Sequence, residues 1–182
     1  MQATGLLVTL RGIALSLMLL AWVLPARAQV SEAELKASFV LSFAKFVTWP
    51  AEALKANPGE LVFCLLGNKD ALYDALSEKQ GKQAQQLTVR FRHVARGDNL
   101  KACQVLVFAD SEVEHSETVL RRLAGQPVLT INGSGHFLEA GGIIGIFGEN
   151  DKLRFDINLA AARQNGLTMS SNLLRLARTV KQ

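Results

Sequence analysis

The chain has 182 residues, 49% of them hydrophobic and 20% charged, with a formal net charge of +4 at pH 7. These values suit one globular domain with its own core and exclude a disordered or low-complexity chain. They also exclude the strongly basic surface that nucleic-acid binding requires.

The first 28 residues are typical of a secretory signal peptide. Arg11 precedes an apolar run from Gly12 to Leu24, and Pro25-Ala26-Arg27-Ala28 ends in an A-x-A cleavage pattern. A membrane anchor is the alternative, but the run has only about 13 residues and a span needs roughly 20. We predict export, cleavage after residue 28 and a mature domain of residues 29–182. Removing Arg11 and Arg27 leaves 18 basic against 16 acidic residues, a net charge of +2.

The mature part is expected to begin with a helix. Ser31 and Glu34 have the spacing of a capping box, and Pro50 restricts Trp49 and ends the run. Apolar residues recur between them at helical spacing: Leu35, Phe39, Phe43, Phe46 and Val47. The aromatic residues of this row have two interpretations. They are core residues of a helix that packs on a sheet, or, with Trp49, they form an exposed patch for a partner.

Strands and helices then alternate along the chain. Apolar runs predict buried strands at Leu61–Leu66 and, with Gln104 as its one polar residue, at Cys103–Phe108; alternation predicts a half-exposed strand at Leu87–Val94. Helices are expected at Asp70–Glu78 and Glu112–Ala124. This order is typical of right-handed βαβ units around a largely parallel sheet.

The stretch from Pro127 to Asn158 is predicted to hold three strands around a glycine corner. Apolar runs at Val128–Ile131 and Ile143–Phe147 predict the first two strands. After a turn at Gly148–Asp151, the segment from Leu153 to Ile157 alternates between apolar and polar residues. This alternation favours an antiparallel hairpin at the margin of the sheet.

Two helices are expected to complete the chain. Asn158 can cap a helix from Leu159 to Gln164, and Ser170 or Ser171 can cap a last one. The last helix is expected to bury Leu173, Leu174, Ala177 and Val180. The predicted fold is a single Rossmann-like α/β domain. It has a mixed, mostly parallel sheet of about six strands, flanked by helices, with a late antiparallel hairpin.

Both cysteines, Cys64 and Cys103, lie in the mature part. Two cysteines in an exported chain predict a disulfide, and closing a loop of about 39 residues would stabilise the fold by roughly 4 kcal/mol. Two buried thiols in neighbouring strands are the alternative. We predict the disulfide, because no C-x-x-C motif or histidine spacing gives the pair a redox or metal-binding role.

Two short motifs resemble catalytic or cofactor-binding patterns. Ser42-Phe43-Ala44-Lys45 matches the S-x-x-K of penicillin-recognising enzymes, but the chain has no K-T-G and only a poor counterpart of S-D-N. Gly133-x-Gly135 follows a predicted strand as in a dinucleotide loop, but Leu138 occupies the position of the third glycine. A tight turn that needs positive φ is the preferred interpretation of these glycines.

No catalytic residue, metal ligand or cofactor site is predicted. His93, His115 and His136 are far apart in the sequence, and no G-x-S-x-G or H-E-x-x-H motif occurs. His136 could face a pocket in the glycine corner. The sequence therefore favours a binding protein over an enzyme such as an unrecognised hydrolase. One alternative is a small-ligand-binding module, with its pocket beyond the carboxyl ends of the strands, near Gly67-Asn68 and Asp110.

Several segments together resemble the YfiR family of periplasmic proteins. The likeness runs from Leu35 to Arg178, through LKASFVLSFAKFVTWP, LVFCLLG and the stretch from Pro127 onward. Its most specific parts are Phe43–Phe46 with Trp49-Pro50, Gly135–Gly142, Arg154–Asn158 and Ser170–Arg178. Cys64 and Cys103 match the disulfide pair of the family in position.

The resemblance implies a compact α/β periplasmic regulator without enzymatic activity. The best-known member of the family binds the periplasmic sensor domain of an inner-membrane diguanylate cyclase, holds it inactive and so keeps biofilm formation low. An outer-membrane OmpA-like lipoprotein can sequester that member, and such proteins can form homodimers. In this chain the residues expected to contact a partner are Phe46 and Trp49, together with His136 and Phe137 of the glycine corner.

Overall fold

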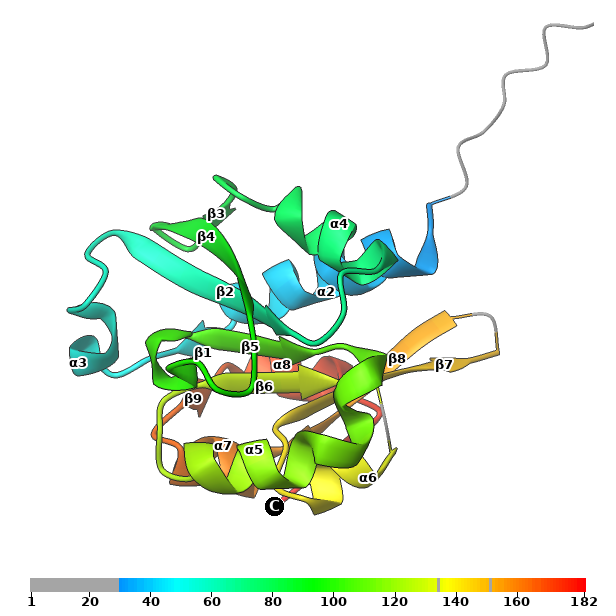
Figure 1. Cartoon of the computed structure of the whole chain (residues 1–182). Coiled ribbons are helices and arrows are strands. Elements are labelled where there is room, and N and C mark those ends of the chain that lie inside the picture. The colour runs from blue at the N-terminus through cyan, green and yellow to red at the C-terminus, as the bar shows by residue number, and fades with distance from the viewer. Residues whose placement is uncertain (1–29, 134, 151) are drawn as a thin grey trace, which may run out of the picture. The chain divides into compact units, whose positions relative to one another are not determined.

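The computed structural model describes residues 30–133, 135–150 and 152–182 (Figure 1). The predicted signal peptide, residues 1–28, lies outside the described residues. The chain divides into two units, Met1–Val30 and Ser31–Gln182. The helices and strands of the described residues all belong to the second unit.

The first helix, α2 (Glu32–Lys45), begins at the predicted capping box. The Ser31 hydroxyl accepts a hydrogen bond from the Glu34 backbone N–H, and the Glu34 carboxylate accepts one from the Ser31 N–H. Both contacts pair backbone donors that the first helical turn leaves free. The helix buries one face against the sheet, through Ala37, Val40, Phe43 and Ala44. The predicted helix start is confirmed.

The described residues form one sheet of eight strands and one of two. The large sheet has the order β10-β8-β7-β6-β5-β2-β4-β3, and β1 pairs with β9 in the small one. The strands are β1 (Val47–Thr48), β2 (Glu60–Leu66), β3 (Gln83–Ala84), β4 (Leu87–Val94), β5 (Val105–Phe108), β6 (Leu129–Asn132), β7 (Ile144–Glu149), β8 (Lys152–Asn158), β9 (Thr168–Met169) and β10 (Thr179–Lys181). The other helices are α3 (Ala51–Leu54), α4 (Ala71–Ser77), α5 (Ser116–Leu123), α6 (Gly135–Glu139), α7 (Leu159–Gln164) and α8 (Ser171–Leu176), with short 3₁₀ helices at η1 (Leu100–Ala102) and η2 (Asp110–His115).

The predicted mixed, mostly parallel α/β sheet is confirmed. Strands β4, β2, β5, β6 and β7 run parallel in the large sheet, while β7 and β8 form the expected antiparallel hairpin. The sheet has more strands than the six expected, because the short β3 and β10 extend its two edges. The hairpin is therefore not at the margin, since β10 pairs in parallel outside β8.

The last helix is shorter than predicted. It ends at Leu176, and Val180, which was expected on its buried face, lies in β10 opposite Ile157. The Arg178 N–H donates to the Phe155 carbonyl, and its guanidinium donates to Asp156 and Glu149. The hydrogen bonds to Asp156 raise the pKa of Arg178 above its ordinary value, with a further contribution from Glu149. These contacts with β7 and β8 outweigh the local helical pattern, so the chain end becomes a strand.

The helix predicted at Glu112–Ala124 begins differently. Residues Asp110–His115 form the 3₁₀ helix η2, and only Ser116–Leu123 form the α-helix α5. The tighter first part leaves Glu112 buried beside Arg96, with 3.2 Å between Arg96 Nε and Glu112 Oε2. This long-range ion pair is not visible in the local helical pattern.

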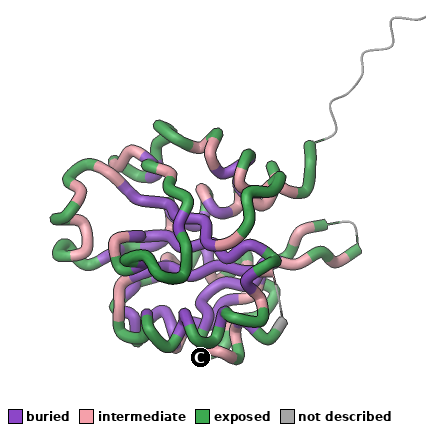
Figure 2. The backbone as a smooth tube through the Cα atoms, in the orientation of Figure 1, coloured by how far each residue is buried: buried purple, intermediate pink, exposed green. Residues whose placement is uncertain are grey.

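The sheet is covered on both faces. The larger core cluster joins one face of the strands to α2 and α4, through Phe43 and Leu76 among others. The smaller cluster joins the other face to α5 and α6, through Leu120 and Phe137. Figure 1 shows α2 and α4 on one side of the sheet and α5 and α6 on the other, and Figure 2 shows buried backbone concentrated in the strands between them.

The predicted disulfide is confirmed. Cys64 and Cys103 are bonded, with 5.9 Å between their Cα atoms and a sequence separation of 39. The bond links the middle of β2 to the residues before β5, and both cysteines are buried. It lies in the smaller core cluster and is therefore a structural bond within the fold.

The glycines of the corner are required mainly for space. Gly133 does not have the positive φ that was expected, but a Cβ there would lie 3.1 Å from the Ile146 carbonyl oxygen. Gly141 does have a positive φ of +98°. A Cβ on Gly142 would lie 2.2 Å from Cε1 of Phe137, whose ring is fully buried. The corner is thus built around the Phe137 ring.

Replacing Gly142 by alanine is expected to destabilise the protein by about 1–3 kcal/mol, because the new methyl group overpacks the Phe137 ring. Urea denaturation measures the change. Gly148→Ala is the matched control, since a Cβ there meets no atom within 4 Å. Adding Phe137→Ala should make the Gly142 substitution less costly. Equal effects of the Gly142 and Gly148 substitutions would contradict this role of the Phe137 ring.

Candidate functional site

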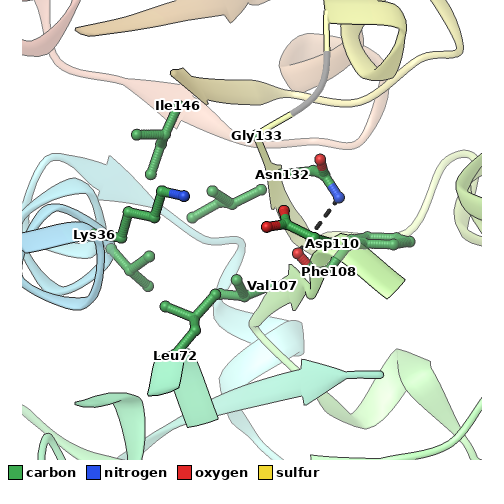
Figure 3. Close-up of a pocket in the computed structure, with 10 residues that line it drawn as sticks. Lys36, Leu72, Val107, Phe108, Asp110, Asn132, Gly133 and Ile146 are labelled. Carbon is green, nitrogen blue, oxygen red and sulfur yellow. Dashed lines mark hydrogen bonds between the residues drawn. The ribbon is translucent and has the colours of Figure 1, made fainter. Parts of the chain in front are cut away.

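A cleft lies over the carboxyl ends of β5 and β6, beneath α2 and α4 (Figure 3). The chain passes from β2 to β4 on one side of β2 and then crosses to β5 on the other side. Ligands of open α/β sheets bind where the strand order reverses in this way. The fold therefore forms a cleft beside the position at which this architecture usually binds molecules.

The cleft has a wide outer part and a narrow inner recess. The outer part has a volume of about 390 Å³ and is bordered by the first turn of α2 and the start of α4. The recess has a volume of about 20 Å³. Its apolar walls are formed by Val40, Leu72, Val107, Phe108, Ile131 and Ile146. Lys36, Leu72 and Asp110 border both parts, so the outer part and the recess are adjacent.

Four charged residues border the outer part: Glu32, Lys36, Asp70 and Asp110. Lys36 Nζ lies 2.8 Å from Glu32 Oε1, one helical turn away. The hydrogen bond from Lys36, together with its positive charge, lowers the pKa of the Glu32 carboxyl, although slight burial opposes this. Asp70 caps α4, because its Oδ1 accepts the N–H groups of Leu72 and Tyr73 at 2.9 and 3.2 Å. Figure 3 shows the Lys36 and Asp110 side chains directed toward the same space.

Asp110 is the one predicted pocket residue that borders the cleft. Gly67 and Asn68, predicted beside it, lie between β2 and α4 and contact η2 and β4 instead. The Asn68 N–H donates to Ser111 Oγ at 3.1 Å, and the Gly67 carbonyl oxygen lies 2.7 Å from His93 Nε2. Lys36 and Leu72 were not predicted from the sequence, since they come from two separate helices. The position of Lys36, one turn before the buried Val40, was a signal that could have identified it.

The four residues predicted to contact a partner do not form one patch. Trp49 belongs to the core on the α2 side of the sheet, with Phe46 half-buried against it, whereas Phe137 is buried in the cluster on the α5 side. Trp49 is 6% exposed, and its Nε1–H donates to the Gln104 carbonyl oxygen at 3.1 Å. The His136 side chain is 97% exposed, and its Nδ1 lies 3.4 Å from Glu139 Oε2. It faces solvent and does not border the cleft.

The aromatic row on α2 is a packing surface. Phe43 is 2% exposed, and its ring centroid lies 4.8 Å from that of Phe155 on β8. Phe39 lies edge-on to both rings, at 5.7 Å from Phe43 and 6.1 Å from Phe155. The interpretation of the row as core is thus confirmed for Phe43 and Trp49.

The described residues hold no group of three or more His, Cys, Asp or Glu side chains placed to bind a metal ion. No helix in the same described part of the chain combines the length and apolar character needed to cross a membrane.

Two solved structures resemble this fold. One is a crystal structure of a conserved domain protein from Vibrio cholerae, with a TM-score of 0.55 and 12% sequence identity over 83% of this chain. The other is the ABC domain from Streptococcus pneumonia in complex with L-Trp, with a TM-score of 0.51 and 14% identity over 78% of this chain. This chain spans 60% of the length of each. At such low identity the likeness concerns the fold alone.

A sequence profile described as YfiR/HmsC-like matches residues 33–178, which is nearly all of the unit Ser31–Gln182. A match to this family suggests a periplasmic regulator, and the buried disulfide is consistent with the oxidising periplasm. The chain belongs to the YfiR/HmsC-like family.

Proposed function

We propose that this protein is a periplasmic regulator that binds the periplasmic sensor domain of an inner-membrane diguanylate cyclase and restrains it. Cyclic-di-GMP and biofilm formation then stay low. The observation that carries the proposal is the family match over residues 33–178, which leaves almost none of the folded unit to another function. Residues 1–28 serve as the cleaved export signal in this proposal, and the disulfide suits the oxidising periplasm.

Restraint of the cyclase requires tighter binding to its inactive state than to its active state, and no chemical step. Reducing an evenly populated receptor to about one active molecule in a hundred needs roughly a 100-fold difference in affinity. That ratio corresponds to about 2.7 kcal/mol, which a few well-packed contact residues supply. An OmpA-like outer-membrane lipoprotein that competes for the regulator would release the cyclase, and homodimerisation of the regulator belongs to the same proposal.

The contact surface of the proposal is centred on α6. His136 projects from this helix into solvent, and the buried Phe137 ring next to it fixes the helix on the sheet. The half-buried Phe46 and the buried Trp49 hold the segment after α2 in place. In this arrangement His136 contacts the partner and Phe137 supports the backbone of α6, while Trp49 stabilises the fold from the other face of the sheet.

His136→Glu is expected to abolish restraint of the cyclase without unfolding the protein, because the substitution changes an exposed side chain at the contact. Deleting the gene should raise intracellular cyclic-di-GMP, and complementation with the unaltered gene should lower it again. The His136→Glu gene should fail to lower it, and the cyclase should no longer copurify with the variant. His115→Glu is the matched control, since His115 is also exposed.

The outcomes separate two parts of the proposal. Unchanged cyclic-di-GMP in the deletion strain, with no cyclase copurifying, would refute the regulatory function. Full restraint by His136→Glu would refute only the placement of the contact on α6.

The cleft favours a second candidate function, a small-ligand-binding module. Its position at the carboxyl ends of the strands and its outer volume of about 390 Å³ are those of a small-molecule site. Thermal-shift screening of the purified protein against amino acids and vitamins tests this candidate directly.

A further inference from the structure

The charges around the cleft do not balance. One ammonium group, that of Lys36, and three carboxylates, those of Glu32, Asp70 and Asp110, border its outer part. Glu32 already pairs with Lys36, and Asp70 is held by two backbone N–H groups of α4. Asp110, by contrast, makes no side-chain hydrogen bond or ion pair within the described residues. The negative charge that remains uncompensated at the cleft is therefore that of Asp110.

The inner recess selects for an apolar group. Its volume of about 20 Å³ holds a group the size of one water molecule or one methyl group. Its walls are mainly the side chains of Val40, Val107, Ile131 and Ile146. Three polar residues, Lys36, Asp110 and Asn132, also border the recess, but most of its wall is apolar, so an alkyl end loses contact with water and gains packing there.

We propose that this cleft binds a small organic cation, a primary amine with a short unbranched alkyl chain. The ammonium group lies at the Asp110 carboxylate in the outer part, and the alkyl end enters the recess beneath Leu72. Lys36 borders both parts of the cleft, and its ammonium repels a second cation, so the ligand carries one positive charge and orients its apolar end inward. This site is separate from α6, so the amine-binding proposal is tested independently of the diguanylate cyclase proposal.

Three probes of equal chain length test the charge requirement on the purified protein at pH 7: pentylamine, pentan-1-ol and pentanoate. Isothermal titration calorimetry should show pentylamine binding at least tenfold more tightly than either of the others, because a charge-assisted hydrogen bond is stronger than a neutral one. Equal binding of pentanol would overturn the role of Asp110. Preferential binding of pentanoate would show that Lys36 governs the site and would also overturn the proposal.

Two variants test the residues. Asp110→Asn keeps the shape of the side chain, removes its charge and should weaken pentylamine binding at least tenfold. Asp74→Asn on the exposed face of α4 is the matched control and should bind as the unaltered protein does. Lys36→Gln removes the repelling charge, frees Glu32 and should tighten pentylamine binding severalfold. Loss of binding in Lys36→Gln, or full binding in Asp110→Asn, would contradict the proposal.

An independent measurement locates the ligand without any substitution. Titration of ¹⁵N-labelled protein with pentylamine should shift the amide resonances of Leu72 and Gly133, which border the cleft, and leave that of His136 unchanged. Shifts confined to residues elsewhere would place the amine outside the cleft and overturn the proposal even if binding occurs.

Discussion

Replacing Cys64 and Cys103 together by alanine is expected to lower the free energy of unfolding by about 4 kcal/mol. The bond closes a loop across 39 residues, and losing it increases the conformational freedom of the unfolded chain. In a domain of this size each kcal/mol corresponds to roughly 2–4 °C in Tm, so Tm should fall by about 8–16 °C. Urea denaturation and calorimetry of the mature protein measure the two quantities.

Reduction of the unaltered protein provides the control. Both cysteines are buried, at 0% and 1% exposure, so folded protein kept for an hour in dithiothreitol and then freed of it before heating should keep its Tm. Dithiothreitol with urea should reproduce the stability of the double variant. A double variant within 1 kcal/mol of the unaltered protein would show that the bond contributes little to folding.

Replacing Trp49 by alanine is expected to cost about 3–5 kcal/mol, because a large buried side chain is removed and leaves a cavity. The substitution also removes the hydrogen bond to the Gln104 carbonyl oxygen. Gln104 connects β2 to α3, since its side chain accepts a hydrogen bond from the Val62 N–H and donates one to the Ala53 carbonyl oxygen, each at 2.9 Å. Loosening Trp49 should therefore disturb the contact between β2 and the segment around α3.

Two further variants make the Trp49 result specific. Trp49→Phe retains most of the packing but loses the hydrogen bond, and an intermediate loss of about 1–2 kcal/mol is expected. Leu176→Ala removes an apolar side chain that is 68% exposed and should change stability by less than about 0.5 kcal/mol. A Trp49→Ala variant as stable as Leu176→Ala would show that Trp49 is a surface residue after all.

Local patterns predicted those elements whose stabilising contacts lie close together in the sequence. The capping box at Ser31 and Glu34 determines the start of α2 through contacts three residues apart. Asn158 caps α7 in the same way, by accepting the Ala161 N–H at 3.0 Å. The predominantly apolar runs became β2 and β5, because strands covered on both faces need apolar side chains on both.

The elements that local patterns mispredicted depend on distant residues. Val180 has helical spacing with Leu173, but pairing with β8 and the ion pairs of Arg178 make its segment a strand. The corner glycines predicted a turn, but only the folded structure shows that Gly142 leaves room for the Phe137 ring. The cleft also depends on distant residues, since Lys36, Leu72 and Asp110 come from three separate elements.

Composition, periodicity and capping were sufficient to establish an α/β domain with a mostly parallel sheet and one disulfide, because these follow from short-range chemistry and from the number of cysteines. Which aromatic side chains are buried, where the sheet ends and which charges meet at the cleft depend on the three-dimensional arrangement. Strand pairing and helix docking bring together residues tens of positions apart, and the free energy of those contacts exceeds local preference. Among the four predicted contact residues only His136 is exposed. The sequence does not distinguish it from the other three, because the burial of Trp49 and Phe137 is visible only in the folded structure.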